Sequence, residues 1–454
     1  MSDQQRVSLS DICFLRNGAG IKQECFGNDG AKIVRVSDFT DTSIDTSSSI
    51  RIDRKYENRW REYFLNEGDI LVATVGSWST SATSAVGKVV TVPPQATNGI
   101  QNQNTCAIIA KSDVADQRYI YYALRQEDFR GFVAGAAAGS ANQARLSIKN
   151  LASYLVSIYS LTEQKAIAHI LGTLDDKIEL NRKTNETLEA MAKALFKSWF
   201  VDFDPVRAKA ERRPTGLPAE ISNLFPDSFE DSELGEIPCG WEMETLGEIL
   251  DVDKGVSYKG DFLSDTEGLP MVNLGCFAGG GAFRAEKMKF YAGEYRERHL
   301  ASAGDLLVAN TDMTQNRVIL GAPIIVPPWR GMDEFLFSHH TFAIRFRRSK
   351  SAFTRFIYFT LLKPSFRQVA AGHATGTTVL ALPKDGITDY LTVIPPAGLL
   401  NVFAAKVEAL YQKGQAFTEQ SELLAKTRDA LLPKLISGEL RIPDAEKMLE
   451  EVGI

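Results

Sequence analysis

The sequence predicts an α+β protein of mixed α/β type, with two globular domains separated by two long helices that form an antiparallel coiled coil. Two observations support this prediction. A heptad seam of apolar residues occurs twice, and the strand-like stretches that precede it also occur twice, at one offset of 236 positions. A repeat of this length indicates two copies of one unit, so we expect an internal two-fold pseudo-symmetry.

The first long helix is predicted over residues 159–201. Its seam residues alternate at spacings of four and three, which is the period of a coiled coil. They are Ile167, Leu171, Leu174, Ile178, Asn181, Asn185, Leu188, Ala192, Leu195 and Trp199. Ser160 and Glu163 have the spacing of a capping box at the start of this helix. Because so long a helix with so narrow an apolar stripe is rarely stable alone, we expect a partner helix beside it.

The partner helix is predicted over residues 395–440 of the same chain. Its seam residues each lie 236 positions after their counterparts. They are Phe403, Val407, Leu410, Gly414, Phe417, Ser421, Leu424, Arg428, Leu431 and Leu435. The stretch 68–73 recurs at the same offset as 304–309, so the domains are repeated together with the helices. Gly414 and Arg428 make the second seam poorer than the first.

The repeat divides the chain into six segments. We expect a first domain over 1–158, the central helix over 159–201, a linker over 202–240, a second domain over 241–394, the distal helix over 395–440 and a tail over 441–454. A hydrophobic content of 44% is sufficient for two real cores. The five cysteines are scattered without a CxxC pair, so neither a zinc site nor a disulfide framework is indicated, and no apolar run approaches membrane-spanning length. We therefore expect a cytoplasmic protein without a membrane partner.

The charge is distributed unevenly along the chain. The net charge is −6, which by itself argues against binding to nucleic acid. Residues 1–158 carry 17 basic and 16 acidic side chains and residues 241–396 carry 17 of each, so the excess of acid lies in the helices and their connections. Neutral domains can present a basic face, but we expect them to bind phosphates weakly without help.

Polar loops in the two domains are the candidate binding residues, because Asn, Gln, Ser, Thr, Arg and His side chains read base edges and position phosphates. In the first domain they are Ser77, Trp78, Ser79, Asn102, Gln103, Asn142, Gln143 and Arg145. In the second domain they are Asn310, Thr311, Gln315, Asn316, Arg317, His339, His340, Thr377 and Thr378. The alternative interpretation is that these loops are solvated turns. His339 and His340 lack a third ligand at a suitable spacing, so no metal site is predicted.

Three stretches carry a resemblance to a known family: LFKSWFVDFDP (195–205), ELGEIPCGWE (233–242) and LLPKLISGEL (431–440). In these stretches, and in its order of domains and repeats, the chain resembles the specificity subunits of type I restriction-modification systems. The resemblance implies a non-catalytic subunit with two target-recognition domains that read the two halves of a bipartite site in double-stranded DNA. It also implies binding to two methyltransferase subunits and two motor-endonuclease subunits, with a role in adenine-N6 methylation and defence against phage.

Motifs for catalysis are absent from the sequence, and no cofactor is predicted. There is no GxxxxGK[ST] loop for ATP, no Gly-rich strand-turn-helix for S-adenosylmethionine and no Asn-Pro-Pro-Tyr type motif for adenine methylation. Two other classes remain open at this stage. A fused restriction-methylation enzyme would need the missing motifs, whereas a structural coiled-coil scaffold would not need two divergent domains.

The seam also predicts the length of the helix pair and which residues face each other across it. From Ile167 to Trp199 it spans 32 residues, roughly 48 Å at about 1.5 Å per residue, or about 14 base pairs of DNA. Antiparallel pairing about a pseudo-two-fold axis places Asn181 opposite Ser421 and Asn185 opposite Phe417. Two copies of residues 1–212 could pair in the same way, with Asn181 of one copy facing Asn185 of the other, so this fragment is expected to form a homodimer.

Overall fold

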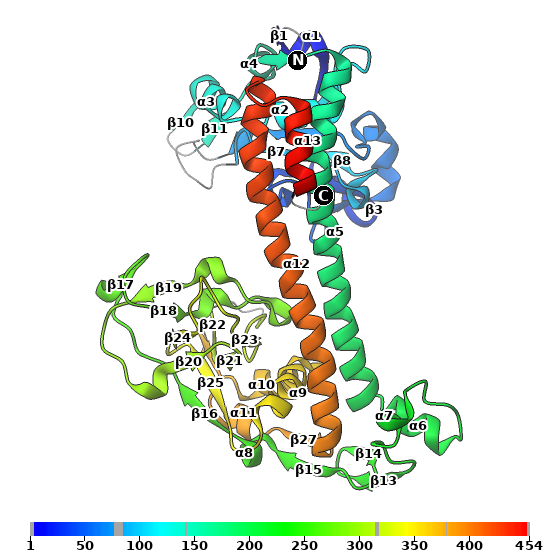
Figure 1. Ribbon diagram of the computed structural model, residues 1–454, viewed down its shortest axis with the longest axis vertical. Coiled ribbons are helices and arrows are strands. Elements are labelled where there is room, and N and C mark those ends of the chain that lie inside the picture. Colours follow the sequence, from blue (N-terminus) through cyan, green and yellow to red (C-terminus); the bar gives the residue numbers. More distant parts are fainter. Residues whose placement is uncertain (1–3, 77–84, 141–142, 314–316, 378, 452–454) are drawn as a thin grey trace. The chain divides into compact units, whose positions relative to one another are not determined.

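The computed structural model describes residues 4–76, 85–140, 143–313, 317–377 and 379–451. The chain forms two compact units, and each long helix contributes to both of them (Figure 1). Unit 1 contains the residues up to Lys183 and those from Phe417 onward, and unit 2 contains Thr184–Ala416.

Unit 1 is built on a four-stranded antiparallel sheet. Its strand order is β2 (Cys13–Asn17), β9 (Thr105–Ala110), β5 (Ile70–Ala73) and β7 (Val89–Thr91). The central strand β5 is buried along its whole length, with Ile70 and Val72 in one core cluster and Leu71 in another. Because both faces of this sheet are covered, β5 is a continuous apolar run rather than an alternating one.

Shorter elements complete unit 1. The strands are β1 (Gln5–Ser8) paired with β12 (Leu155–Ile158), β4 (Arg51–Ile52), β3 (Phe26–Val34) and β8 (Ile100–Gln101) in a second sheet, and β10 (Ala138–Ser140), β11 (Gln143–Arg145) and β6 (Val75–Gly76) in a third. The helices are α1 (Leu9–Ile12), α2 (Gln117–Ala123), α3 (Glu127–Ala136) and α4 (Ile148–Ala152). Strands β10 and β11 pair antiparallel, so Gln143 and Arg145, which were expected in a polar loop, lie in a strand.

Unit 2 repeats this plan. Its main sheet has the order β16 (Leu250–Lys254), β25 (Thr341–Phe346), β21 (Leu306–Ala309) and β23 (Pro323–Ile325), so each strand takes the place of its counterpart in unit 1. A second sheet has the order β17 (Leu263–Ser264), β19 (Lys289–Tyr291), β18 (Leu269–Val272), β24 (Glu334–Phe337) and β20 (Leu300–Ser302). The remaining elements are β15 (Glu242–Thr245) with β27 (Leu391–Ile394), β22 (Thr311–Asp312) with β26 (Leu380–Ala381), α8 (Leu246–Ile249), α9 (Lys350–Leu362), α10 (Pro364–His373) and α11 (Asp385–Thr388). The internal duplication is thus confirmed as a repeat of topology.

The two long helices are α5 (Leu161–Phe200) and α12 (Ala397–Ser437). At the start of α5 the amide of Glu163 donates to Ser160 Oγ at 3.4 Å. After α12, Gly438 adopts a φ of 77°, the left-handed conformation in which glycine commonly terminates a helix. In unit 1 Asn181 Nδ2 donates to Ser421 Oγ at 3.2 Å and to Gln420 Oε1 at 2.9 Å. The predicted antiparallel register, with Asn181 facing Ser421, is therefore confirmed.

In unit 2 the helix pair is closed by aromatic rings from the end of α5 and the start of α12. The ring centroids of Phe200 and Phe403 lie 4.9 Å apart, and those of Trp199 and Phe403 lie 6.2 Å apart. Phe196 stacks on Phe359 of α9 at 5.3 Å. The aromatic stretch that ends the central seam therefore packs on α12 and on the second domain together, which makes α5 part of the wall of that domain.

Residues 202–240, expected to be a linker, are folded. They form α6 (Asp204–Ala210), α7 (Ala219–Ser222) and a hairpin of β13 (Phe229–Ser232) and β14 (Gly235–Pro238). Phe225 is buried in the core of unit 2 and meets Trp199 edge-on at 5.2 Å, and Ile237 of β14 is also buried. The segment is rich in Pro, Glu and Arg and its apolar residues are isolated, so its sequence did not indicate a folded segment. The other segment boundaries remain predictions.

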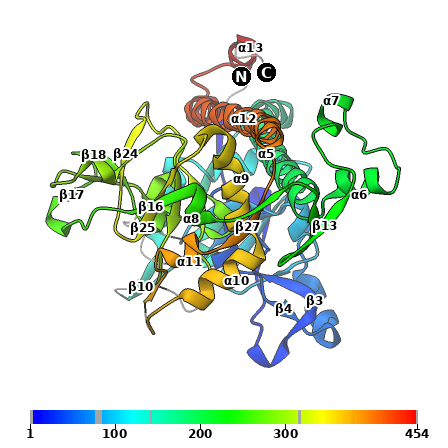
Figure 2. The same ribbon diagram turned by 90° about the horizontal axis from the view of Figure 1, so that it is seen from below.

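Residues 441–454, expected to be a tail, contain a further helix, α13 (Ile442–Glu451). Ala445 and Leu449 are buried in the core of unit 1 together with Ile436 of α12. Both views place α13 alongside the paired helices (Figures 1 and 2). Within the described part of the chain, no helix is long and apolar enough to span a membrane.

Replacing Phe403 with Ala should lower the free energy of unfolding of unit 2 by about 3–5 kcal/mol, because it removes a fully buried ring from the aromatic cluster. Urea unfolding followed by tryptophan fluorescence measures the loss. Met191→Ala is the control, since Met191 on α5 is 52% exposed and its truncation should change stability by less than about 0.5 kcal/mol. Equal effects of the two substitutions would contradict this account of the core.

Candidate nucleic-acid interface

In unit 1 three polar segments meet beyond the end of strand β5. The amide of Thr74 donates to the carbonyl of Asn104 at 2.8 Å, and the amide of Leu146 donates to the carbonyl of Thr74 at 2.9 Å. Val75 of β6 lies opposite Arg145 of β11. We name residues 74–76, 102–104 and 144–146 corner 1. It brings together the predicted residues Asn102, Gln103 and Arg145.

Unit 2 has the same corner at the end of strand β21. The amide of Asn310 donates to the carbonyl of His340 at 3.0 Å, and the amide of Leu382 donates to the carbonyl of Asn310 at 2.7 Å. Thr311 of β22 lies opposite Ala381 of β26. Each of these residues lies 236 positions after its counterpart in corner 1. We name residues 310–312, 338–340 and 380–382 corner 2; it contains the predicted Asn310, Thr311, His339 and His340.

The side chains of the two corners differ although their backbones are bonded alike. Gln103 and Asn104 of corner 1 correspond to His339 and His340 of corner 2. The exposed side chain of Gln103 and the half-buried one of Asn104 are amides, whereas both half-buried side chains in corner 2 are imidazoles. One backbone frame therefore presents different hydrogen-bonding groups in the two units.

A chain of hydrogen bonds fixes His340. Asn310 Nδ2 donates to the carbonyl of His339 at 3.1 Å, so Asn310 Oδ1 is the acceptor for the hydroxyl of Thr311 at 2.7 Å. Since the single hydroxyl proton of Thr311 is used in this way, the contact of 3.2 Å between His340 Nδ1 and Thr311 Oγ1 requires the imidazole to donate. The proton of a neutral His340 therefore lies on Nδ1, and Nε2 is an acceptor.

Both imidazoles of corner 2 are held neutral. Burial lowers the pKa of His339 and His340, and the nearby ammonium of Lys254 lowers the pKa of each further. The two rings are 3.9 Å apart between centroids, so a charge on His339 would also oppose one on His340. His339 Nδ1 is buried and has no hydrogen-bond partner among the described residues. The described residues contain no group of three or more His, Cys, Asp or Glu that could hold a metal ion.

The other predicted residues lie apart from the corners or outside the described residues. Arg317 is exposed and donates from Nη1 to the carbonyl of Ala371 on α10 at 3.3 Å, and Thr377 is exposed. The backbone of Gln143 belongs to β11. Ser77, Trp78, Ser79, Asn142, Gln315, Asn316 and Thr378 lie outside the described residues.

Sequence reasoning missed one buried polar residue beside corner 1 and another within corner 2. Gln101 is fully buried, and its Nε2 donates to the carbonyl of Arg16 at 3.0 Å and to that of Thr105 at 3.1 Å, which anchors the segment that leads into corner 1. Asp312 is also fully buried and accepts from the amide of Ile319 at 2.9 Å. Both residues stand in polar stretches that suggest exposure, so the sequence carries no signal for their burial.

Because the folded pKa of His339 and of His340 lies below the unfolded value near 6.5, the unfolded chain binds more protons as the pH falls. The stability that depends on these neutral rings is present above about pH 6.5 and is lost below it. Between pH 7.5 and 5.5 the Tm of the wild type should therefore fall further than that of the His339→Asn/His340→Asn variant. His299, whose pKa burial also lowers, is unchanged in both proteins. Equal shifts in Tm would show that the pair is not held neutral.

Comparison with known proteins shows which proteins the chain is similar to. The model of the type I restriction modification DNA specificity domain matches residues 1–190. The chain is 27% identical over 355 residues to the type I restriction enzyme MjaIX specificity subunit of Methanocaldococcus jannaschii, covering 76% of this chain and 73% of that one. It is 26% identical over 346 residues to the HindI specificity subunit of Haemophilus influenzae, covering 67% and 73%.

The fold is similar to that of a solved structure. The S subunit of the type I restriction-modification system from M. genitalium aligns with a TM-score of 0.52 at 15% identity, covering 95% of this chain and 96% of that one. In sequence and in fold the chain is therefore similar to the specificity subunits of type I restriction-modification systems.

Proposed function

We propose that the chain is the DNA-reading subunit of a cytoplasmic type I restriction-modification complex. Each globular domain reads one half of a bipartite site in double-stranded DNA, and the chain itself catalyses neither cleavage nor methylation. Two methyltransferase subunits and two motor-endonuclease subunits dock on it. The observation that carries this proposal is the pair of corners, in which one backbone frame presents amides in unit 1 and imidazoles in unit 2.

The chemistry of corner 2 favours a base with an exocyclic amino group. A neutral His340 with its proton on Nδ1 offers Nε2 as an acceptor, which complements the amino group of adenine or cytosine in the major groove. In corner 1 Gln103 offers both a donor and an acceptor, the pattern that pairs with the N6 and N7 edge of adenine. The two corners therefore favour different half-sites.

In each unit an ion pair links the globular domain to a long helix, which supports a role of the helix pair in setting the spacer between the two half-sites. In unit 1 Arg118 of α2 donates to Asp176 of α5 at 2.6 Å. In unit 2 Arg355 of α9 donates to Glu408 of α12 at 2.9 Å and lies 3.9 Å over the ring of Tyr411. Because each domain is bonded to a helix that the other domain also uses, helix length sets the distance between the half-sites in our proposal.

Substitution of one corner should change one half of the recognised site. In the complex with the methyltransferase subunits, His340→Ala should reduce discrimination at one base pair of the second half-site by about 1–3 kcal/mol, because it removes the acceptor. Gln103→Ala should act only on the first half-site. Methylation mapping of a randomised bipartite library measures both effects, and His373→Ala is the control, since His373 is an exposed histidine on α10.

Two outcomes would count against the proposed function. One is a change in both half-sites from either single substitution. The other is cleavage or methylation of DNA by the isolated chain. In gel-shift experiments the isolated chain should bind the site weakly, because neutral domains make too few phosphate contacts, and the methyltransferase subunits should restore tight binding.

Lengthening the helix pair should lengthen the preferred spacer. Seven residues with the heptad pattern are inserted between Lys183 and Thr184 and another seven between Ala416 and Phe417, which leaves both units and the seam intact. This adds about 10.5 Å, or about three base pairs. Methylation mapping should show a longer spacer with unchanged half-sites. Insertion in α5 alone is the control, since it puts the two seams out of register. An unchanged spacer in the variant with both insertions would contradict the proposal that helix length sets the spacer.

A further inference from the structure

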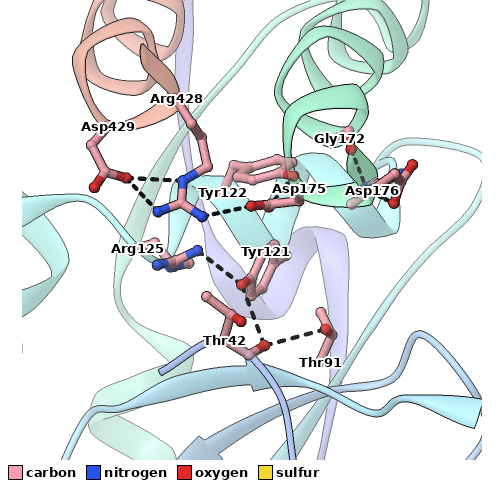
Figure 3. A network of polar contacts seen from close by, with 11 residues as sticks. Thr42, Thr91, Tyr121, Tyr122, Arg125, Gly172, Asp175, Asp176, Arg428 and Asp429 are labelled. Atoms are coloured by element: carbon pink, nitrogen blue, oxygen red, sulfur yellow. Dashed lines mark hydrogen bonds and ion pairs between the residues drawn. The ribbon is translucent and has the colours of Figure 1, made fainter. Parts of the chain in front are cut away.

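A buried ion pair crosses the helix pair in unit 1 (Figure 3). Arg428 occupies a seam position of α12, and its Nη1 donates to Asp175 Oδ1 on α5 at 2.6 Å. The side chains are only 8% and 19% exposed. Arg428 also binds Asp429 Oδ1 through Nε at 2.9 Å and Nη2 at 2.7 Å. A charged residue at a coiled-coil seam is unfavourable unless its partner is in place.

The same carboxylate ties the first domain to the helices. The hydroxyl of Tyr122 on α2 donates to Asp175 Oδ2 at 2.6 Å, while Arg428 occupies Oδ1 (Figure 3). Burial and the nearby Asp175 charge both raise the pKa of Tyr122, so it stays protonated and donates. Both oxygens of Asp175 are therefore used, and the loss of Arg428 would leave one of them without its cation.

This ion pair is not duplicated, although the seams are. At the offset of 236 positions Ala192 on α5 corresponds to Arg428, and Tyr411 on α12 corresponds to Asp175. Ala192 is fully buried in the core of unit 2. The acid is thus found on one helix and the base on the other, so only unlike helices can form the bond.

Pairing of like helices would leave each charge without the partner that it has on the other helix. In two copies of α5 with the same register, Asp175 would face Ala192. The residue after Ala192 is Lys193, which is half exposed and lies 3.9 Å from Glu189. In two copies of α12, Arg428 would face Tyr411. The central amide does not discriminate in this way, because Asn181 can face Ser421 in the chain or Asn185 in a second copy.

We propose that Asp175 and Arg428 form a pairing-specificity element, which directs α5 to α12 and disfavours pairing between the first helices of two copies of this chain. The expected homodimer of residues 1–212 is therefore opposed by Asp175 wherever a second half carrying Arg428 is present. This inference concerns partner choice by the helices and does not depend on which bases the corners read.

The test uses the full chain carrying a protease site in the exposed segment 211–214. After cleavage only non-covalent contacts hold the two halves together, and native mass spectrometry counts unlike and like pairs of halves after incubation. We expect the cleaved wild type to remain as unlike pairs of one chain mass, 50.1 kDa before cleavage. The Asp175→Leu/Arg428→Leu variant keeps an apolar seam but loses the ion pair that distinguishes α12 from a second α5. The number of pairs made of two first halves should therefore rise by about tenfold or more.

A charge exchange provides the matched control. Asp175→Arg/Arg428→Asp restores an unlike pair of opposite polarity and should keep the wild-type preference, even if removal of the Tyr122 contact lowers its Tm. The proposal is overturned if the double Leu variant sorts as selectively as the wild type, or if the cleaved wild type re-sorts into like pairs. Failure of the charge exchange to restore selection while it remains folded would also overturn it.

Discussion

The antiparallel pairing of α5 with α12 is the constraint on which both units depend, because neither domain closes its core without the helices. In unit 1 Ile167, Leu171 and Leu174 of α5 belong to the same core cluster as the strands of the main sheet. In unit 2 Phe196 of α5 and Phe403 of α12 share a cluster with Phe356 of α9. The helices therefore serve as a coiled coil and as a wall of each domain. A change in their register would disturb the seam and both cores together.

Polar groups in the seam provide the register that apolar packing alone would leave open. Asn181 finds Ser421 and Gln420, and Asp175 finds Arg428. Such buried polar groups contribute little net stability, since their bonds mainly offset desolvation, but they penalise every arrangement that separates them. In this protein they coincide with the joint between α2 and α5, so the position of the first domain and the pairing of the helices are specified by the same carboxylate.

Sequence reasoning predicted the features that repeat and missed those that do not. The seams were visible because a four-three alternation persists over ten positions, and the pairing of Asn181 with Ser421 followed from the symmetry of the repeat. The folded segment 202–240 and helix α13 each bury only a few apolar residues, such as Phe225 and Leu449. So few residues do not establish a helical or strand spacing, so the sequence did not indicate these elements. Likewise, polar loops could be proposed as binding residues, but the tautomer of His340 depends on Thr311 and Asn310, whose proximity only the fold establishes.

Duplication explains why the corners could diverge while the helices acquired an asymmetric bond. The corners are closed by main-chain hydrogen bonds, so a change from Gln103 to its counterpart His339 leaves the frame intact. The helix pair is different, because in a two-fold dimer of identical helices every seam contact occurs twice and the two partners come from the same sequence. An acid such as Asp175 can then gain a buried base only if that base also appears on its own helix, at the position of Ala192. Two unlike helices in one chain remove this restriction, since Arg428 can be introduced on α12 while Ala192 remains in the core of unit 2.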